Sequence, residues 1–569
     1  FDDDGVLDLI IGAWADEIEA EEPIGNAGAA HVFLGREGEV PAMDPSFSAS
    51  GLNGGDQFGE SVAILGDVDG DGQGDLMVTA ARSHELGVHV GRAYAVGGED
   101  GVVTPLVHPG EIAGHRFGNA VDIADLNGDG LPELIVGAPR SPNPPAQVRA
   151  GSVHIFSGQD AFASPAPPVS QLGGLPDLTR DDNFGFRVNH GDFNGDGETD
   201  LAIASLGEER PNNLGDEYVA DGSCRRSSGS GAIYLYRASL ALQVESRPSA
   251  IYYGGTGGAG SRPIAWSDVN GDSKQDLIVG GPLADGPRDS GRFEVVLGRD
   301  WLGAEQTRLL CDPILEVSGE QSNGQLGFTG IGLGDLNGDG CEEFAVSEVR
   351  RRANEQSDAG VIRVVFGWGG AGCPNRAEQV LISVGRNGEQ LGSALAHIPP
   401  RRRSPGWLVA GAHRHRRYED NRRTGGAYLI SLDWIAQQTR RPVTNNEAPI
   451  IIAERGDDLI PIEGMTNEAY FGASLDVQGE LLAIGELYGR YGEARSVGGV
   501  HLYRLNGSEV TSVGLVVGET DRLGGRVGNA LKLFGDPPRL LVGGFQGGGN
   551  GAEAGSAYLF EMDDLLLVR

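Results

Sequence analysis

The sequence predicts an all-β protein, a β-propeller of about seven to nine four-stranded blades, and three observations support this fold class. The chain of 569 residues contains 93 Gly and 29 Pro, which is typical of a folded protein with many turns. Short apolar strands recur in the same order along nearly the whole sequence, and a nine-residue acidic loop recurs at one place within that order. We therefore expect the chain to consist of copies of one unit.

Each unit contains three recognisable strands. The first follows a Phe-Gly or Leu-Gly pair, as in QFGESVAILG at 57–66, and the second ends in small residues, as in VGAP at 136–139. The third begins with Gly, as in GSVHIFSG at 151–158. Alternation of apolar and polar residues with a period of two, bounded by Gly and Pro, indicates strands, and the length of a unit allows one four-stranded sheet.

Eight units are complete, and the first lacks its opening strand. A separate sheet of about 60 residues would leave one face unburied, so we expect one propeller over 1–569 rather than a series of small domains. The approximate bounds of the expected units are 1–50 (truncated), 51–110, 111–178, 179–253, 254–320, 321–385, 386–465, 466–518 and 519–569.

The acidic loop DVDGDGQGD at 67–75 places carboxylates at its positions 1, 3, 5 and 9 and Gly at position 6. Calcium takes six to eight oxygen ligands, and a tight turn with acids at alternate positions can supply them to one ion. An EF-hand is excluded because it needs an acid at position 12, where this loop has Val78 in an apolar strand. The sequence thus predicts calcium in a β-hairpin loop, with plain Asx-turns as the alternative.

Five loops carry the full pattern. Their predicted metal ligands are Asp67, Asp69, Asp71 and Asp75; Asp125, Asn127, Asp129 and Glu133; Asp192, Asn194, Asp196 and Asp200; Asp268, Asn270, Asp272 and Asp276; and Asp335, Asn337, Asp339 and Glu343. Asp2, Asp4 and Asp8 are the remains of a sixth site, so we expect five or six Ca²⁺. Ser273 replaces the position-6 Gly of its loop, which predicts the weakest of the five complete sites.

Net charge, cysteine spacing and the absence of a membrane-spanning run restrict the class of partner and the compartment. A net charge of −37 argues against nucleic acid and favours cations, and we find no apolar run long enough for a membrane span. Cys224, Cys311, Cys341 and Cys373 form no CxxC pair and allow three disulfide pairings in an oxidising compartment. The chain begins inside a repeat motif, so we interpret the N-terminus as truncated and expect no signal peptide to be visible.

These motifs together resemble a known family. The FG pair, the DxNGDGxxD loop, the LIVGAP corner and the GxVxxF strand are similar to the FG-GAP repeats of the integrin α-subunit N-terminal propeller and its bacterial relatives. The resemblance implies calcium in the hairpin between the first two strands of certain blades, and ligand binding by loops after the GAP corner on the opposite face. Two features depart from integrins: that family has seven blades, and here the last three units lack the acidic loop.

The loops after the corner in the sixth to eighth units carry Arg side chains that could form one basic sector. They are Arg350, Arg351, Arg352, Arg414, Arg416, Arg417, Arg422, Arg423, Arg490 and Arg495. Arg guanidinium groups suit carboxylate, sulfate or phosphate ligands. The alternative is that these residues are solvated loop tips paired with nearby acids such as Glu419 and Asp420.

The sequence therefore favours a non-catalytic, calcium-binding propeller outside the cell or at its surface, which binds a protein or an anionic polysaccharide in the manner of an adhesion module. One alternative is a polysaccharide lyase that holds uronates with Arg and His and transfers protons with Tyr418, Tyr488 or Tyr491. Another is the accessory propeller of a larger enzyme. No catalytic motif distinguishes them.

Overall fold

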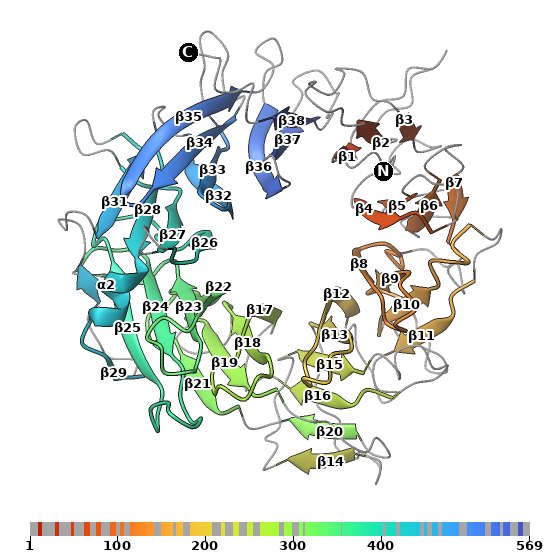
Figure 1. The fold of residues 1–569 in the computed structure, drawn as a ribbon, viewed down its shortest axis with the longest axis horizontal. Coiled ribbons are helices and arrows are strands. Elements are labelled where there is room, and N and C mark those ends of the chain that lie inside the picture. The colour runs from red at the N-terminus through yellow and green to blue at the C-terminus, as the bar shows by residue number, and fades with distance from the viewer. Residues whose placement is uncertain are drawn as a thin grey trace. The chain divides into compact units, whose positions relative to one another are not determined.

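The computed structural model consists of β-strands, turns and one short helix in the part of the chain that it describes (Figure 1). The described residues are 62–68, 75–80, 91–97, 103–106, 114–141, 150–162, 167–173, 183–206, 231–237, 247–253, 262–283, 289–298, 307–310, 313–353, 355–401, 406–416, 422–443, 449–451, 458–464, 469–488 and 498–517, with the strands 9–13, 29–33, 47–50, 218–221, 525–534, 539–546 and 556–561. The all-β architecture confirms the predicted fold class, because most of the described strands form four-stranded antiparallel sheets.

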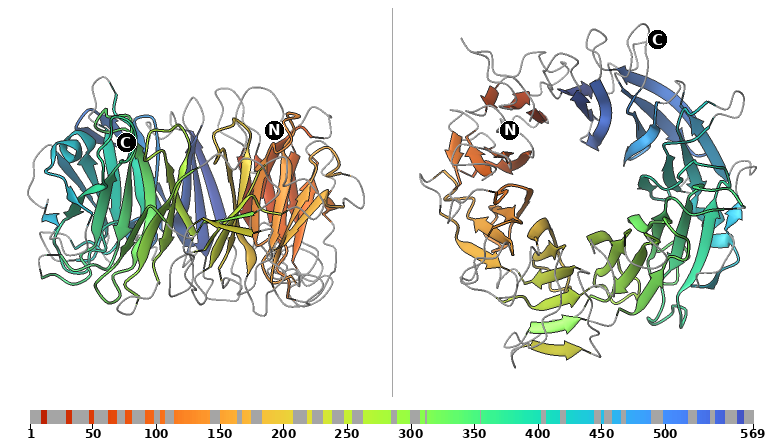
Figure 2. Two further views of the ribbon diagram at one scale, coloured as in Figure 1. Left: turned by 90° about the horizontal axis from the view of Figure 1, so that it is seen from below. Right: turned by 180° about the vertical axis from the view of Figure 1, so that it is seen from behind.

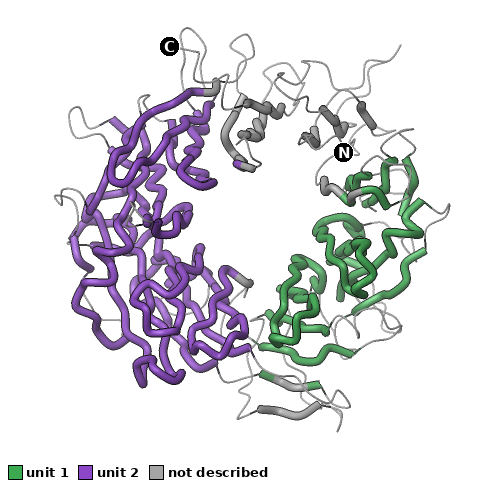
Figure 3. The backbone as a smooth tube through the Cα atoms, in the orientation of Figure 1, with its two compact units in different colours: residues 1–261, 299–312, 550–555 green, residues 262–298, 313–549, 556–569 purple. Residues whose placement is uncertain are grey.

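The chain divides into two compact units (Figure 3). Unit 1 comprises residues 1–261, 299–312 and 550–555, and unit 2 comprises 262–298, 313–549 and 556–569. In both units most sheets are antiparallel meanders of strands that are neighbours in the sequence, and two sheets gain additional strands at one edge. Figure 2 shows the strands from two further sides.

Unit 1 contains four sheets. The first sheet has β1 (Leu9–Ala13), β2 (Ala29–Phe33) and β3 (Phe47–Ser50), and the second has β4 (Val62–Gly66), β5 (Asp75–Ala80), β6 (Arg92–Val96) and β7 (Val103–Pro105). The third sheet has β8 (Ala120–Ala124), β9 (Glu133–Ala138), β10 (Ser152–Phe156) and β11 (Ser170–Gly173), and the fourth has β12 (Phe184–Gly191), β13 (Asp200–Ser205), β15 (Ala232–Tyr236) and β16 (Ala250–Tyr253). Beyond β16 this fourth sheet continues with β20 (Thr307–Leu310) and β14 (Tyr218–Asp221), which pair in parallel.

In unit 2, the first sheet has β17 (Arg262–Ser267), β18 (Asp276–Gly281), β19 (Arg292–Val296) and β21 (Leu315–Ser318). The second has β22 (Leu326–Gly334), β23 (Glu343–Glu348), β24 (Val361–Phe366) and β25 (Glu378–Ser383), extended by β29 (Arg441–Pro442) and β30 (Ile450–Ile451), and the third has β26 (Leu395–Ile398), β27 (Trp407–Ala412), β28 (Gly426–Ser431) and β31 (Leu459–Glu463). The fourth has β32 (Phe471–Gln478), β33 (Leu481–Glu486), β34 (Gly499–Asn506) and β35 (Glu509–Val517), and the fifth has β36 (Gly525–Phe534), β37 (Arg539–Gln546) and β38 (Ser556–Glu561).

The hydrophobic cores lie between neighbouring sheets. In unit 1, Ile155 of β10 packs in one cluster with Phe184 of β12 and Tyr234 of β15, and the rings of Phe184 and Tyr234 meet edge to face at 4.9 Å. In unit 2, Phe293 of β19 shares a cluster with Phe344 of β23. These sheets therefore pack against their neighbours through apolar side chains, which is why an isolated sheet would be unstable.

Glycines allow the sheets to approach each other. A Cβ on Gly137, in the small-residue corner after β9, would lie 2.3 Å from the carbonyl oxygen of Gly185 in the next Phe-Gly pair. The same contact joins Gly280 to Gly327. In addition, Gly151, at the start of β10, has φ +92° and forms a parallel bridge with Phe184. The Phe-Gly pair, the corner and the Gly-led strand thus meet at one junction between sheets, which explains why each unit contains all three.

One helix departs from the repeat pattern. α2 (Leu432–Gln437) follows β28, and the Ser431 side chain caps it by accepting from the N–H of Trp434 at 3.2 Å. Leu432, Trp434 and Ile435 bury its apolar side in the core of unit 2. Among the described residues, no helix is both long and apolar enough to cross a membrane.

Candidate metal centre

The acidic loops connect the first two strands of a sheet. The loops at 125–133, 192–200, 268–276 and 335–343 follow β8, β12, β17 and β22, and their ninth residue begins the second strand. Asp67 and Asp75 occupy the equivalent places after β4, with Asp67 exposed and Asp75 fully buried. Asp69 and Asp71 of that loop, and Asp2, Asp4 and Asp8, lie outside the described residues.

The carboxylate at position 9 closes every described loop. It is buried, and one of its oxygens accepts the backbone N–H of position 2. The five donor–acceptor distances are 2.9 Å for Val68 to Asp75, 2.8 Å for Leu126 to Glu133, 3.1 Å for Phe193 to Asp200, 2.8 Å for Val269 to Asp276 and 2.6 Å for Leu336 to Glu343. This acid therefore has a structural role that the sequence analysis, which assigned it only as a ligand, did not include.

The carboxylate at position 1 holds the turn from the other side. Asp125 accepts the N–H groups of Gly128 at 2.7 Å and Gly130 at 3.0 Å, and both glycines have positive φ. Ser273 takes the place of the second glycine in the 268–276 loop, where it adopts φ +66° and donates its N–H to Asp268 at 2.7 Å. A non-glycine residue in this conformation costs about 1 kcal/mol, so the loop at 268–276 is strained at Ser273.

The side chain at position 3 contacts the acids at position 5 or position 9. The side-chain amide nitrogen of Asn127 lies 2.9 Å from an oxygen of Asp129 and 2.8 Å from an oxygen of Glu133. The corresponding amide of Asn337 lies 2.9 Å from Glu343, and that of Asn270 lies 3.1 Å from Asp272. The position-3 side chain thus contacts both other positions in the 125–133 loop, only position 9 in the 335–343 loop and only position 5 in the 268–276 loop.

Burial, together with the neighbouring acids, raises the pKa of the carboxylate at position 9. Burial raises the pKa of Asp276 to about 7, and the charges of Asp272 and Asp268 act in the same direction. Burial likewise raises the pKa of Glu343 to about 8, with Asp339 and Asp335 contributing. Buried carboxylates of this kind are stabilised in their charged form by a cation. The oxygen-only donor set fits a hard cation such as Ca²⁺, although the same hydrogen bonds also describe Asx-turns.

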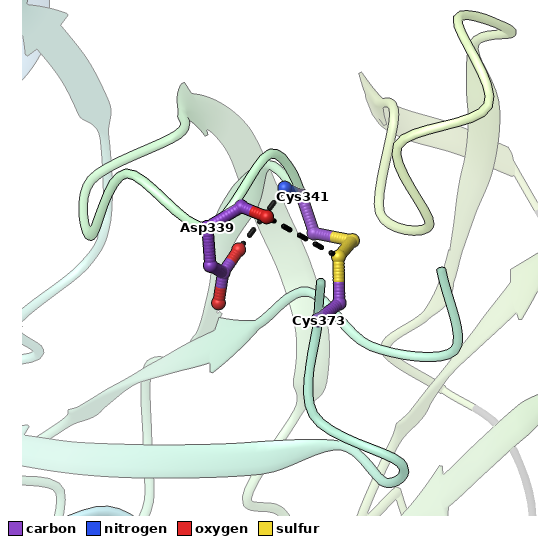
Figure 4. A group of neighbouring side chains, drawn as sticks. All are labelled: Asp339, Cys341 and Cys373. Atoms are coloured by element: carbon purple, nitrogen blue, oxygen red, sulfur yellow. Dashed lines mark hydrogen bonds between the residues drawn. A yellow bond between two sulfur atoms is a disulfide. The ribbon is translucent and has the colours of Figure 1, made fainter. Parts of the chain in front are cut away.

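A disulfide fixes the last of these loops. Cys341, at position 7, is bonded to Cys373, with their Cα atoms 6.1 Å apart (Figure 4). The N–H of Cys341 also donates to the Asp339 carboxylate at 3.0 Å. Because both sulfurs are in the disulfide, they cannot bind a metal as thiolates. The sequence left three pairings open, and the structure contains this one, while Cys224 and Cys311 lie outside the described residues.

The candidate ligand-binding arginines differ in their surroundings. Arg350 and Arg352 are exposed, whereas Arg351 is buried and pairs with Glu348 at 3.0 Å. The guanidinium of Arg351 is therefore held in the interior against Glu348. Arg422 and Arg423 are exposed. Arg417, Arg490 and Arg495, together with Tyr418 and Tyr491, lie outside the described residues.

Three consecutive sheets of unit 2 meet at His413. Burial, together with the charges of Arg414 and Arg350, lowers the pKa of His413 to about 4. Its ring stacks on Tyr470 at 5.6 Å, and Tyr470 contacts Tyr488 at 5.2 Å. These contacts place the loops after β23, β27 and β33 next to one another. Arg414 is half-buried, and no described group accepts the hydrogen of its buried Nε.

His415 lies in a buried cluster that the sequence did not reveal. The His415 ring contacts Glu389 at 2.9 Å and Glu463 at 3.2 Å, and the Tyr428 hydroxyl lies 3.0 Å from the same ring. His501 pairs with Glu486 at 2.9 Å in the next sheet. No local sequence pattern signals these pairs, because the partners are far apart in the chain. His415 is 1% exposed, so this cluster lies in the interior of the protein.

Comparison with known proteins agrees with the local architecture. Residues 117–156 match the sequence model of the FG-GAP repeat family. The chain therefore contains an FG-GAP repeat at these residues. This match covers β8, β9 and β10 together with the acidic loop at 125–133.

Relatives of this FG-GAP protein include two groups. Phosphatidylinositol-glycan-specific phospholipase D of Bos taurus is 34% identical over 155 residues, which is 24% of this chain and 17% of that protein. Integrin alpha-IIb of Mus musculus is 36% identical over 164 residues, 27% of this chain and 15% of the integrin. Integrin alpha-PS2 of Drosophila melanogaster is 29% identical over 259 residues, 41% of this chain and 16% of the integrin. The chain thus matches less than a fifth of the length of each of these relatives.

Proposed function

We propose that this FG-GAP protein is a non-catalytic propeller outside the cell, whose acidic loops bind Ca²⁺ and whose opposite loops bind a protein or an anionic polysaccharide. The observation that carries the calcium proposal is the contact between the side chains at positions 3 and 9, which repeats in the 125–133, 192–200 and 335–343 loops, together with the buried acid at position 9 that closes each loop. Calcium would supply positive charge that neutralises the gathered carboxylates.

The residues of the chain prepare the loops for this ion. In the 125–133 loop, Asp125, Asn127, Asp129 and Glu133 would hold it. The N–H groups of Gly128 and Gly130 orient the Asp125 carboxylate, and that of Leu126 orients Glu133. The loop is therefore largely shaped before the ion binds, which lowers the entropy lost on binding.

Calcium binding can be tested by thermal unfolding and calorimetric titration. We expect the melting temperature to fall in a chelator and to recover with Ca²⁺, because an ion that binds only the folded state stabilises the folded state. Asp129→Asn should weaken one site. Asp160→Asn, in the turn after β10, serves as the control for loss of one exposed charge outside the loops. A melting temperature that responds neither to chelator nor to Ca²⁺ would overturn the calcium proposal.

Two observations support a ligand site at the Arg-bearing loops. Arg350 and Arg414 both act on His413, so their positive charges lie near one another, and the Nε of Arg414 has no acceptor among the described groups. Arg guanidinium groups bind carboxylate and sulfate groups through paired hydrogen bonds. The similarity to integrin α-subunits supports ligand binding as the role of the chain, and the Cys341–Cys373 disulfide favours an oxidising compartment.

Ligand binding can be tested with immobilised anionic glycans and extracellular matrix proteins across a salt series, with the protein loaded with calcium. We expect binding that weakens as salt rises and that is lost in the double variant Arg350→Glu, Arg414→Glu. Arg140→Glu, an exposed Arg after β9, is the matched control. Loss of binding in the control as well would point to net charge instead of a site, and release of oligosaccharides would favour a lyase.

A second candidate, the accessory propeller of a larger enzyme, is favoured by the similarity to a phospholipase D. Only 17% of the length of the bovine protein is matched, so the similarity does not identify an activity in this chain. The intact mass of the native protein, measured after immunoprecipitation from its source, would test this candidate. A mass close to 59.6 kDa would exclude a larger polypeptide.

A further inference from the structure

Two neighbouring acidic loops of unit 2 are joined by the side chain of Glu342. Its carboxylate accepts the N–H of Asp268 at 3.0 Å and the hydroxyl of Ser267 at 3.2 Å. The N–H of Glu342 in turn donates to the carbonyl oxygen of Asp268 at 2.9 Å. Both backbone polar groups of Asp268, at position 1 of its own loop, are therefore held by position 8 of the next loop.

The segment that carries Cys373 contacts both loops. The N–H of Trp368 donates to the carbonyl oxygen of Val269 at 2.8 Å, and a Cβ on Gly370 would overlap the carbonyl oxygen of Asn270. Cys373 ties the same segment to Cys341. The 335–343 loop and the segment 367–374 thus form one linked structure that contacts the 268–276 loop along its first three residues.

This arrangement is not a general property of the repeat. Position 8 of the acidic loop is Pro132 in the third repeat, Thr199 in the fourth and Gln275 in the fifth. Among these loops, only the 335–343 loop has a carboxylate at position 8, which is Glu342. In the third unit, a Cβ on Gly158 would lie 2.4 Å from the carbonyl oxygen of Pro132 and 3.4 Å from the Val68 side chain. Neighbouring loops approach there as well, but Pro132 has neither an N–H nor a carboxylate with which to hold the preceding loop.

We propose that Glu342 is a positioning residue that couples the 268–276 and 335–343 loops, so that a cation bound by one raises the affinity of the other, and that the Cys341–Cys373 disulfide maintains this coupling. The inference rests on the calcium proposal above. An ion in the 335–343 loop would order Glu342, and Glu342 then fixes the backbone of Asp268. The second ion consequently binds a 268–276 loop that is already ordered, so less conformational entropy is lost when it binds. By reciprocity, an ion in the 268–276 loop favours binding in the 335–343 loop.

The coupling compensates for the strain at Ser273. That residue, in the left-handed conformation, weakens the 268–276 loop relative to the loops with Gly at position 6. Contacts from Glu342 and Trp368 supply an external support that the loop at 125–133 does not need. The strained loop is thus held by hydrogen bonds from the next sheet.

Terbium luminescence can report on the coupled loops separately. Tb³⁺ is a common probe for calcium sites and emits when a nearby indole is excited. Trp266 precedes Asp268 by two residues, so we would use the Trp368→Phe background, in which Trp266 remains as the sensitiser beside the 268–276 loop. Asp272→Asn, which removes a ligand of that loop, should abolish the Trp266-dependent signal and so validates its assignment.

The decisive measurement is a double-mutant cycle. Asp339→Asn disables the 335–343 loop, and we expect it to raise the apparent Tb³⁺ dissociation constant of the 268–276 loop at least about five-fold. In the Glu342→Ala background the same change should have less than about a two-fold effect. Glu342→Gln keeps an acceptor oxygen without the charge and should retain most of the coupling. Thr199→Ala, at position 8 of an uncoupled loop, is the matched control.

The disulfide and the stability of the apo protein provide independent readouts. The double variant Cys341→Ser, Cys373→Ser should reduce the coupling in the same direction as Glu342→Ala. The thermal midpoint in chelator shows whether each variant is folded. Ser267→Ala, which removes a hydroxyl that donates to the Glu342 carboxylate and to the Glu343 carbonyl oxygen, replaces Glu342→Ala if that variant does not fold. An effect of Asp339→Asn that is equal with and without Glu342 would overturn the inference. Absence of any Tb³⁺ or Ca²⁺ binding would instead overturn the calcium proposal itself.

Discussion

A Cβ atom added to Gly411 would lie 2.1 Å from the carbonyl oxygen of Gly472, so the backbones of two neighbouring sheets touch at this pair. Gly411 belongs to the corner after β27, and Gly472 belongs to the Phe-Gly pair at the start of β32. The two motifs that characterise the repeat are therefore two sides of one contact. Gly137 with Gly185 and Gly280 with Gly327 repeat it elsewhere in the chain.

Gly411→Ala should therefore destabilise the protein. The new methyl group meets backbone that cannot rotate away, and overpacking of this kind costs about 1–3 kcal/mol. Gly388→Ala is the control, since its Cβ would meet nothing within 4 Å and only the positive φ of +76° is strained. The measurement is the free energy of unfolding in a denaturant titration. A smaller loss for Gly411→Ala than for Gly388→Ala would contradict the role of the glycine contact.

The acid at position 9 should matter with and without calcium. Glu343→Ala leaves the N–H of Leu336 without its 2.6 Å acceptor, which costs about 1–3 kcal/mol for a buried group. Asp339→Ala removes a more exposed acid at position 5 and should lower the melting temperature chiefly when calcium is present. Thermal unfolding of both variants in chelator and in Ca²⁺ makes the comparison. Equal effects of the two variants in chelator would argue against a closing role for Glu343.

Ser273→Gly should strengthen the 268–276 loop. The substitution keeps the backbone N–H that donates to Asp268 and relieves a strain of about 1 kcal/mol at φ +66°. If this strain is present only when the loop holds Ca²⁺, removing it raises the affinity for Ca²⁺ about five-fold. Gly340→Ser, at position 6 of the 335–343 loop, should have the opposite effect on its own site. Titration of the two variants, with the wild type as reference, checks both signs.

His413 should make stability depend on pH. Burial, together with Arg414 and Arg350, lowers its pKa from 6.5 to about 4, so between these values the unfolded chain binds a proton that the folded chain does not. The stability contributed by neutral His413 is therefore complete above pH 6.5 and decreases as the pH falls towards 4, by about 1.4 kcal/mol per pKa unit at most. His413→Asn should flatten this part of the profile. Melting temperatures between pH 4 and 7 test it, and identical slopes for variant and wild type would contradict it.

Local features of the sequence predicted the fold well. The Phe-Gly pair, the acidic loop and the small-residue corner each lie within about ten residues, and their order along the chain specifies a meander of strands. The spacing of the acids also placed each loop in a hairpin. Position 6 was recognised as a glycine position, and Ser273 has the positive φ that this implies.

The sequence did not predict contacts between neighbouring repeats. The contact of Glu342 with Asp268 joins residues 74 positions apart, and nothing in either loop alone indicates it, although an acid next to Cys341 at position 8 is unusual among the five loops. The run of three arginines at 350–352 shows the same limit. The sequence treats them alike, but the turn after β23 directs Arg351 into the sheet towards Glu348 and leaves Arg350 and Arg352 exposed.

The path of the chain through β20 limits how this protein can be divided. After β19 in unit 2 the chain passes to unit 1, where β20 pairs with β16 and β14, and then returns to unit 2 to form β21. A recombinant fragment that ends at residue 261 would omit β20 and leave the edge of β16 unpaired, which invites aggregation. A fragment that begins at residue 262 would carry β20 without its partners. Neither half is thus a natural unit for expression, and a single proteolytic cut between them would divide the strands of one sheet between two polypeptides.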